Sequence, residues 1–101
     1  MDPERISDFN ISDVVISTAG RDAGKLFYVI GTDPVYLLLA NGKDRTLDKP
    51  KRKKRRHIKK VLRSETRVAE KLRNGDKVLN SELRRDLEFI AREMQSHDLG
   101  G

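Results

Sequence analysis

The feature that most restricts the fold of this chain is a set of three short apolar runs that follow one another closely. They cover residues 14–16, 26–30 and 35–39, and they are rich in β-branched and aromatic side chains. Gly, Asp, Asn and Pro occur in the breaks around these runs and favour turns. No break is long enough for the crossover helix that parallel neighbours require, so we expect an antiparallel meander.

The residues after these runs indicate how the sheet continues. Asn41 and Gly42 both tolerate positive φ, so we expect a tight hairpin turn at this point. Pro50 disfavours a helix at the start of the basic segment that follows. Residues 57–62 are expected to form a further strand, because a small sheet needs another strand to cover its apolar face.

The last third of the chain has helical patterns. Ser64 is expected to cap a first helix that Gly75 ends, and Asn80 or Ser81 to cap a second. The apolar residues of the second helix recur at a spacing that places them on one face: Leu83, Leu87, Ile90 and Met94. An isolated helix of this length is marginal in water, so this face is expected to pack on the sheet or on a partner.

Charge is distributed very unevenly along the 101 residues, a length that allows one domain. The formal net charge is +6, yet residues 43–63 hold twelve Lys and Arg against two Asp. The remaining chain is therefore net acidic. One dense cationic segment on such a body indicates a polyanionic partner, either a nucleic acid or an anionic membrane surface. The membrane is the weaker alternative, because neither Trp nor Phe flanks the segment.

Residues 51–56 are six consecutive cations. They repel one another in a free protein, whereas bound phosphates would neutralise them and release condensed counterions. Their Arg side chains can also contact a phosphate in bidentate fashion. A solvated charged loop is the alternative interpretation.

Residues 17–25 form a second candidate feature between two predicted strands. Gly20 and Gly24 let the backbone approach a ligand closely, and Arg21 and Lys25 flank that backbone. Such a turn is common, so an ordinary β-turn remains an alternative. The segment is not a P-loop, because the spacing of its glycines is wrong and because no Gly-Lys-Ser/Thr sequence follows.

Residues 14–30 resemble a KOW motif, in which a strand, a loop with a fixed glycine and a second strand follow one another. Gly24 stands at the position of that glycine. Residues 49–57 are similar to the basic segment of bacterial KOW-domain RNA-binding proteins, which are relatives of an archaeal and eukaryotic large-subunit ribosomal protein group. Residues 79–84 resemble the start of the C-terminal helix in that bacterial group. The resemblance covers roughly residues 13–90.

The resemblance implies a mainly β protein: a small SH3-like β-barrel of KOW type, followed by one or two C-terminal helices. On this basis we expect an acidic arm over residues 1–12, a barrel over 13–63 with its basic segment at 49–60, and a helical extension over 64–98. The implied function is binding of structured RNA, ribosomal RNA in particular, through backbone phosphates. The expected RNA-binding residues are Arg21, Asp22, Lys25, Lys49, Lys51, Arg52, Lys53, Lys54, Arg55, Arg56, Lys59 and Lys60.

Other chemistry is not expected from this sequence. The chain lacks Cys, and its two His, His57 and His97, are far apart, so we predict no metal site, no cofactor and no enzymatic activity. A solvent-facing Tyr28 or Tyr36 could stack on a base, although packing within the sheet is the more common role of such residues.

Two other functions remain open. One is a KOW module of the transcription-elongation type that contacts RNA polymerase, and the other is a peripheral binder of anionic membranes. Ribosomal proteins are further possible partners of the C-terminal helix. The first residues lack the basic and apolar stretches of a secretory signal, so a cytoplasmic location is expected.

Overall fold

The computed structural model describes the backbone of residues 9–100 and the side chains of residues 9–96. In this part of the chain, five strands form one antiparallel sheet and two helices follow it, so the expectation of a mainly β protein with C-terminal helices is confirmed. The strands are β1 (Asp13–Ser17), β2 (Leu26–Thr32), β3 (Tyr36–Ala40), β4 (Lys51–Lys54) and β5 (Ile58–Arg63). A short 3-10 helix, η1 (Arg55–His57), joins β4 to β5, and the helices are α2 (Arg67–Asn74) and α3 (Asn80–Gly100). Most of the predicted acidic arm, residues 1–8, lies outside the described residues.

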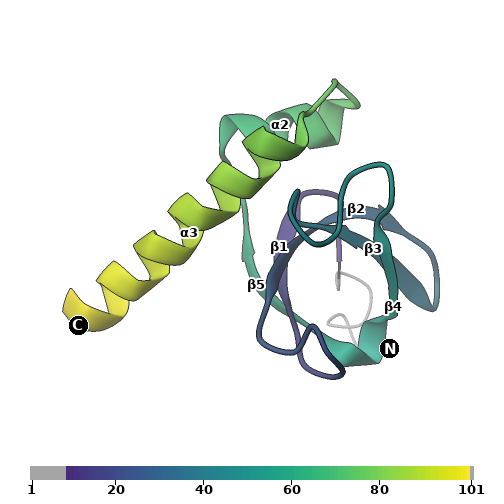
Figure 1. Ribbon diagram of the computed structural model, residues 1–101, viewed down its shortest axis with the longest axis horizontal. Helices are drawn as coiled ribbons and strands as arrows, with labels where there is room; N and C mark the ends of the chain where they lie inside the picture. The colour runs from purple at the N-terminus through teal and green to yellow at the C-terminus, as the bar shows by residue number, and fades with distance from the viewer. Residues whose placement is uncertain (1–8, 101) are drawn as a thin grey trace, which may run out of the picture.

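The strand order in the sheet is β4-β3-β2-β1-β5. The first three strands pair with their sequence neighbours, which confirms the predicted meander. The strand predicted over residues 57–62 is β5, and it pairs with β1 at the far side of the sheet. The sheet is strongly curved, and both helices lie outside the curve (Figure 1). The two edge strands of the sheet are β4 and β5, and η1 connects them along the chain.

The sheet buries apolar side chains on both of its faces. The inner face holds one cluster: Val15, Phe27, Val29, Leu37, Leu39 and Ile58. The outer face packs against the helices through another: Val14, Tyr28, Ala40, Ala69, Leu83, Leu87 and Ile90. The predicted apolar face of the second helix is thereby confirmed, with Met94 partly buried at its end. Phe27 and Tyr28 point to opposite faces, and both are fully buried because both faces are covered.

The tight turn expected at Asn41 and Gly42 is wrong: β3 and β4 do pair as an antiparallel hairpin, but ten residues, 41–50, connect them. Gly42 does have positive φ, at +77°. The Asn41 side chain accepts hydrogen bonds from the backbone N–H groups of Lys43 and Arg45, which builds a wider turn. This turn packs on the start of α3, where a Cβ on Gly42 would lie only 2.2 Å from the carbonyl oxygen of Asn80. Packing against a distant helix thus selects the longer connection.

The two helix starts also differ from the sequence prediction. Thr66, not Ser64, caps α2, and its hydroxyl accepts a hydrogen bond from the backbone N–H of Ala69. Asn80 opens α3, but its side chain accepts from the Leu47 N–H at 2.8 Å instead of capping its own helix. The other end of α2 agrees with the prediction, since Gly75 closes it in the left-handed conformation.

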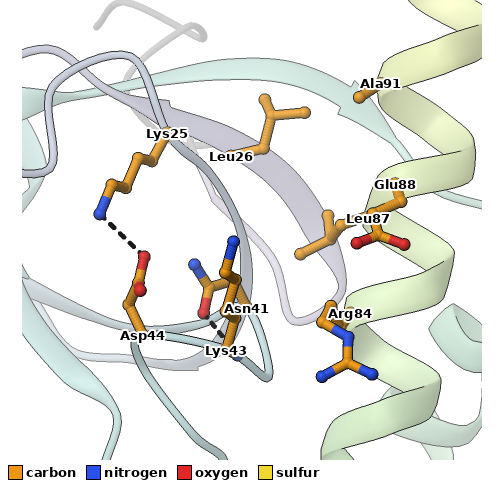
Figure 2. Close-up of a pocket in the computed structure, with 9 residues that line it drawn as sticks. All are labelled: Lys25, Leu26, Asn41, Lys43, Asp44, Arg84, Leu87, Glu88 and Ala91. Carbon is orange, nitrogen blue, oxygen red and sulfur yellow. Dashed lines mark hydrogen bonds and ion pairs between the residues drawn. The ribbon is translucent and has the colours of Figure 1, made fainter.

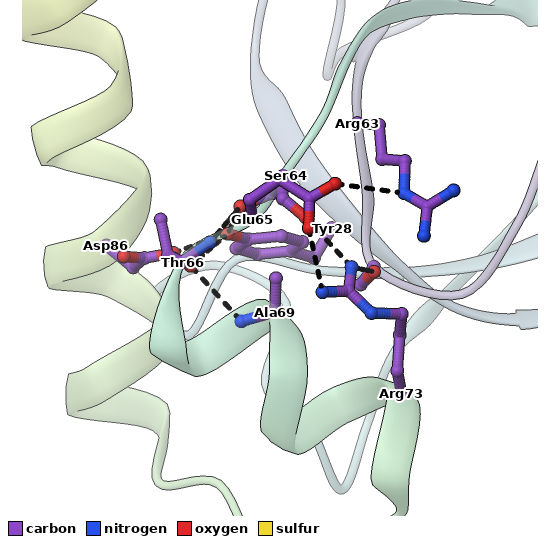
Figure 3. A network of polar contacts seen from close by, with 9 residues as sticks. Tyr28, Arg63, Ser64, Glu65, Thr66, Ala69, Arg73 and Asp86 are labelled. Carbon is purple, nitrogen blue, oxygen red and sulfur yellow. Dashed lines mark hydrogen bonds and ion pairs between the residues drawn. The ribbon is translucent and has the colours of Figure 1, made fainter.

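A partly buried polar network fastens the helices to the sheet (Figure 3). Tyr28 on β2 hydrogen-bonds to Ser64 at 2.8 Å and to the Asp86 carboxylate on α3. The same carboxylate accepts from the hydroxyl of Thr66 at 2.8 Å. Ser64 is thus withdrawn from capping because its hydroxyl serves this network. The network fixes where both helices lie on the outer face, and it leaves β4 and η1 uncovered by them.

Candidate nucleic-acid interface

The run of six cations is ordered as an edge strand and a helical turn. In the register with β3, Lys51 lies opposite Leu39 and Lys53 opposite Leu37, so these two lysines share the inner face of the sheet. Arg52 and Lys54 point to the outer face and are exposed. The alternation of a strand therefore divides consecutive cations between two faces, which reduces their mutual repulsion.

Lys53 ties the loop at residues 18–25 to this edge of the sheet. Its ammonium group donates a hydrogen bond to the carbonyl of Ala19, and the Thr18 N–H donates to the carbonyl of His57 at 2.9 Å. The loop that carries exposed Arg21 is thereby held beside β4 and η1. The structure thus brings together the two features that the sequence analysis singled out separately.

The loop glycines both take backbone conformations that other residues rarely adopt. Gly20 has φ of +77° and Gly24 has φ of +88°. The Gly24 N–H closes the loop by donating to the Ser17 carbonyl at 2.8 Å. A Cβ on Gly20 would lie 3.4 Å from the Lys53 ammonium nitrogen, so the loop and this lysine are already in close contact.

Asp22 and Lys25, both predicted to contact RNA, are engaged within the protein. Asp22 is 4% exposed, and its carboxylate pairs with Arg45 at 3.3 Å. Lys25 donates to Asp44 at 2.8 Å, and this hydrogen bond is the main cause that lowers the pKa of the Asp44 carboxyl. Asp22 therefore holds the shape of the loop, and Lys25 is directed away from β4.

Lys25 stands at the rim of a cavity of about 320 Å³ that lies between the start of β2, the β3–β4 connection and α3 (Figure 2). Leu26, Leu87 and Ala91 give the cavity an apolar lining. Its charged rim mixes both signs, with Lys and Arg beside Asp44 and Glu88. Such a rim does not select a polyanion, so the candidate interface is the basic edge of the sheet and not this cavity.

Arg55 and Lys60 also have partners inside the molecule. The guanidinium Nε of Arg55 donates to the carbonyl of Asp33 at 2.8 Å. Lys60 pairs with the buried carboxylate of Asp13 at 3.1 Å and lies over the ring of Phe9. These contacts connect η1 and β5 to the body of the protein, and they order the segment that carries the remaining cations.

Six of the predicted RNA-binding side chains form no hydrogen bond or ion pair with any described residue. They are Arg21, Lys49, Lys51, Lys54, Arg56 and Lys59. We call this set the unpaired cations. Five of the six are exposed, the exception being Lys51. Lys51 and Lys54 lie on β4, Arg56 lies on η1, and Lys49 comes shortly before β4. Arg21 lies in the loop at residues 18–25, and Lys59 lies on β5. An unneutralised group of positive charges on an ordered scaffold can attract a polyanion at long range.

Arg52 has a neighbour that the sequence did not predict, the ring of Tyr36. Its guanidinium carbon lies 3.7 Å from the centroid of the Tyr36 ring. Tyr28, the other tyrosine considered for base stacking, is fully buried and cannot meet a base. Only the pairing of β3 with β4 brings Tyr36 and Arg52 together. This pairing could not be predicted from the sequence, because a run of cations lacks the β-branched and aromatic residues that are typical of a strand.

No group of three Asp, Glu or His side chains is arranged to hold a metal ion in the described part of the chain. None of its helices has the length and apolar character needed to span a bilayer. The chain matches no protein-family model, and no curated protein matches it either.

Proposed function

We propose that this protein binds structured RNA, ribosomal RNA in particular, through the phosphates of the RNA backbone. The observation that carries the proposal is the set of unpaired cations on the ordered edge formed by β4 and the residues just before it, η1, the start of β5 and the loop at residues 18–25. Phosphates would supply the partners that these side chains lack, and release of counterions would favour the complex. The proposed role is binding and not catalysis, and it implies a cytoplasmic location.

We also propose that the curved sheet is a small SH3-like barrel of the KOW type. Its five antiparallel strands and the short η1 connection support this assignment, because η1 brings the ends of the two edge strands together. The hydrogen bond from Lys53 to Ala19 spans from β4 to the β1–β2 loop. The positive φ of Gly24 agrees with the glycine that the resemblance requires.

A protein contact on the helical side fits the same proposal. Phe89 on α3 is 49% exposed, although it is a large aromatic residue. It lies on the opposite side of the helix from the packed face, which contains Leu87 and Ile90. A ribosomal protein beside the RNA site would be a suitable partner for this residue.

Salt-dependent RNA binding tests the proposal. Log affinity plotted against log salt concentration should fall with a slope of about −4 to −6, if roughly half of the twelve cations in residues 43–63 contact phosphates. Replacing Lys51, Lys54, Arg56 and Lys59 with Gln should make this slope less steep by about 3. A control in which four cations of the helical part, Arg67, Arg85 and Arg92 on the helices and Lys77 between them, become Gln loses the same charge. It should retain most of the slope.

Equal losses in the two variants would mean that net charge alone drives binding, and would overturn the assignment of the interface. Absence of RNA binding by the parent protein would overturn the function. Copurification from cells separates the remaining alternatives: ribosomal subunits are expected, whereas RNA polymerase would indicate the transcription module. Flotation with anionic vesicles but not with neutral ones would indicate the membrane alternative.

A further inference from the structure

Part of the outer face of the sheet is not covered by the helices. The helices pack on Tyr28 and Ala40, whereas Leu38, two residues before Ala40 on the same face, is 37% exposed. Val35, just before β3, is 53% exposed. In Figure 1, α3 runs along the β1 and β5 side of the molecule, while β4 lies on the side away from it. The bare area is therefore the outer face of β4 and of the part of β3 before Ala40.

Four side chains share this bare area because of the strand register. Tyr36 lies opposite Lys54, and Leu38 lies opposite Arg52. Directly paired residues of antiparallel strands point to the same face, so two apolar and two cationic side chains alternate on it. The Arg52 guanidinium crosses diagonally onto the Tyr36 ring, at 3.7 Å from its centroid.

The neighbouring strand, β2, leaves room next to Leu38. Gly31 on β2 lies opposite Leu38, and a Cβ on Gly31 would come within 3.0 Å of the Leu38 side chain. The absence of a side chain at Gly31 keeps the surface beside Leu38 flat. A flat apolar surface next to an exposed planar guanidinium has the shape that an aromatic base needs.

The backbone under Tyr36 is also held in place. The Asp33 carboxylate accepts hydrogen bonds from the N–H groups of Val35 and Tyr36, at 2.8 and 2.7 Å. These two hydrogen bonds are the main reason that the pKa of the Asp33 carboxyl is lowered, and the positive charges of Arg52 and Arg55 lower it further. Arg55 binds the carbonyl of the same aspartate. The backbone that carries the Tyr36 ring is therefore ordered before any ligand arrives, which reduces the entropy cost of binding.

We propose that this face binds one unpaired nucleotide of the RNA. The base stacks on the exposed face of the Arg52 guanidinium, which is backed by Tyr36, and contacts Leu38; Lys54 binds the adjacent phosphate. The inference rests on the proposed RNA binding and adds a substrate class, namely RNA with an accessible loop or bulge. A fully paired helix conceals the faces of its bases, whereas unpaired bases stack on aromatic rings and on Arg.

Two RNA probes with the same number of phosphates test this inference. One is a hairpin with 2-aminopurine in its single-stranded loop, and the other is a blunt duplex. Tyr36→Leu removes the ring but stays apolar, and Arg52→Lys keeps the charge but loses the planar group. Each is expected to weaken hairpin binding about tenfold and duplex binding little, and to reduce the change in 2-aminopurine fluorescence. Arg85→Lys is the matched control, because Arg85 is exposed on α3, outside the proposed interface, and it should change neither.

Arg52→Lys alters an exposed residue, so it stays informative if Tyr36→Leu affects folding. The inference is overturned if both variants bind the hairpin like the parent, or if they weaken hairpin and duplex equally. Either result would leave this face as a phosphate or protein contact. The proposed function fails in a different manner, since the parent protein would then bind neither probe.

Discussion

The hydroxyl of Tyr28, on β2, donates a hydrogen bond to the Asp86 carboxylate on α3, 58 residues further along the chain. The sheet and the C-terminal helices are therefore joined by a partly buried polar contact as well as by apolar packing. Thr66, the cap of α2, donates to the same carboxylate. One carboxylate thus fixes a strand, a helix start and a second helix relative to one another.

Tyr28→Phe should destabilise the protein by about 1–3 kcal/mol, because it leaves the Asp86 and Ser64 groups short of a buried hydrogen-bond partner. Urea denaturation measures this change. Tyr36→Phe is the matched control, since the Tyr36 hydroxyl forms no hydrogen bond with any described residue. Equal effects of the two substitutions would show that the network contributes nothing beyond packing.

Stability should decline at alkaline pH because of the same tyrosine. Burial, and then the hydrogen bond to Asp86, raise the pKa of Tyr28 from 10.0 to about 12. The fold favours the neutral phenol, so its contribution is complete below pH 10 and is lost as the pH rises from 10 to 12. Melting temperatures over this range should fall more steeply for the parent than for Tyr28→Phe. Parallel curves would contradict the assignment.

Leu87→Asp should destabilise the protein by about 3 kcal/mol or more, because Leu87 is 6% exposed between α3 and the sheet. Chemical denaturation gives the value. Phe89→Ser, on the exposed side of the same helix, is the control and should change stability little. Folded Leu87→Asp protein should retain its RNA affinity, since β4 and η1 lie elsewhere. An unchanged free energy of unfolding would mean that α3 is not held by its apolar face.

Two glycines with similar backbone angles should respond differently to substitution. Gly24→Ala meets no atom within 4 Å and should cost only the strain of its positive φ, about 1 kcal/mol. Gly42→Ala adds a clash with the Asn80 carbonyl, so its cost should be clearly larger. Thermal melts of the two variants rank the costs, and the reverse order would be inconsistent with the packing of the 41–50 connection on α3. Gly24→Val should be costlier than Gly24→Ala, at about 1–3 kcal/mol, because it is β-branched.

Local patterns in the sequence were enough to predict most of the scaffold. The three apolar runs gave the meander, and the spacing of Leu83, Leu87 and Ile90 gave the buried face of α3. In both patterns, apolar residues recur at a fixed spacing, and this spacing can be read from residues that are close together in the chain. Gly75 as a helix end was predictable for the same reason, since the conformation required there is local.

The tertiary structure decided how the polar residues are used. Ser64 looks like a cap, but pairing with a distant tyrosine leaves the capping to Thr66. Asn41 and Gly42 look like a hairpin, but contact with α3 selects a longer loop.

The basic run forms a strand only because it pairs with β3. That pairing directs Lys53 to Ala19 and places Arg52 on Tyr36, whereas Lys54 and Arg56 remain without partners. The sequence by itself thus determined how much positive charge this protein carries and that it follows a small sheet. Which cations stabilise the fold and which are left for a ligand was decided by strand register, a long-range property that no local pattern encodes.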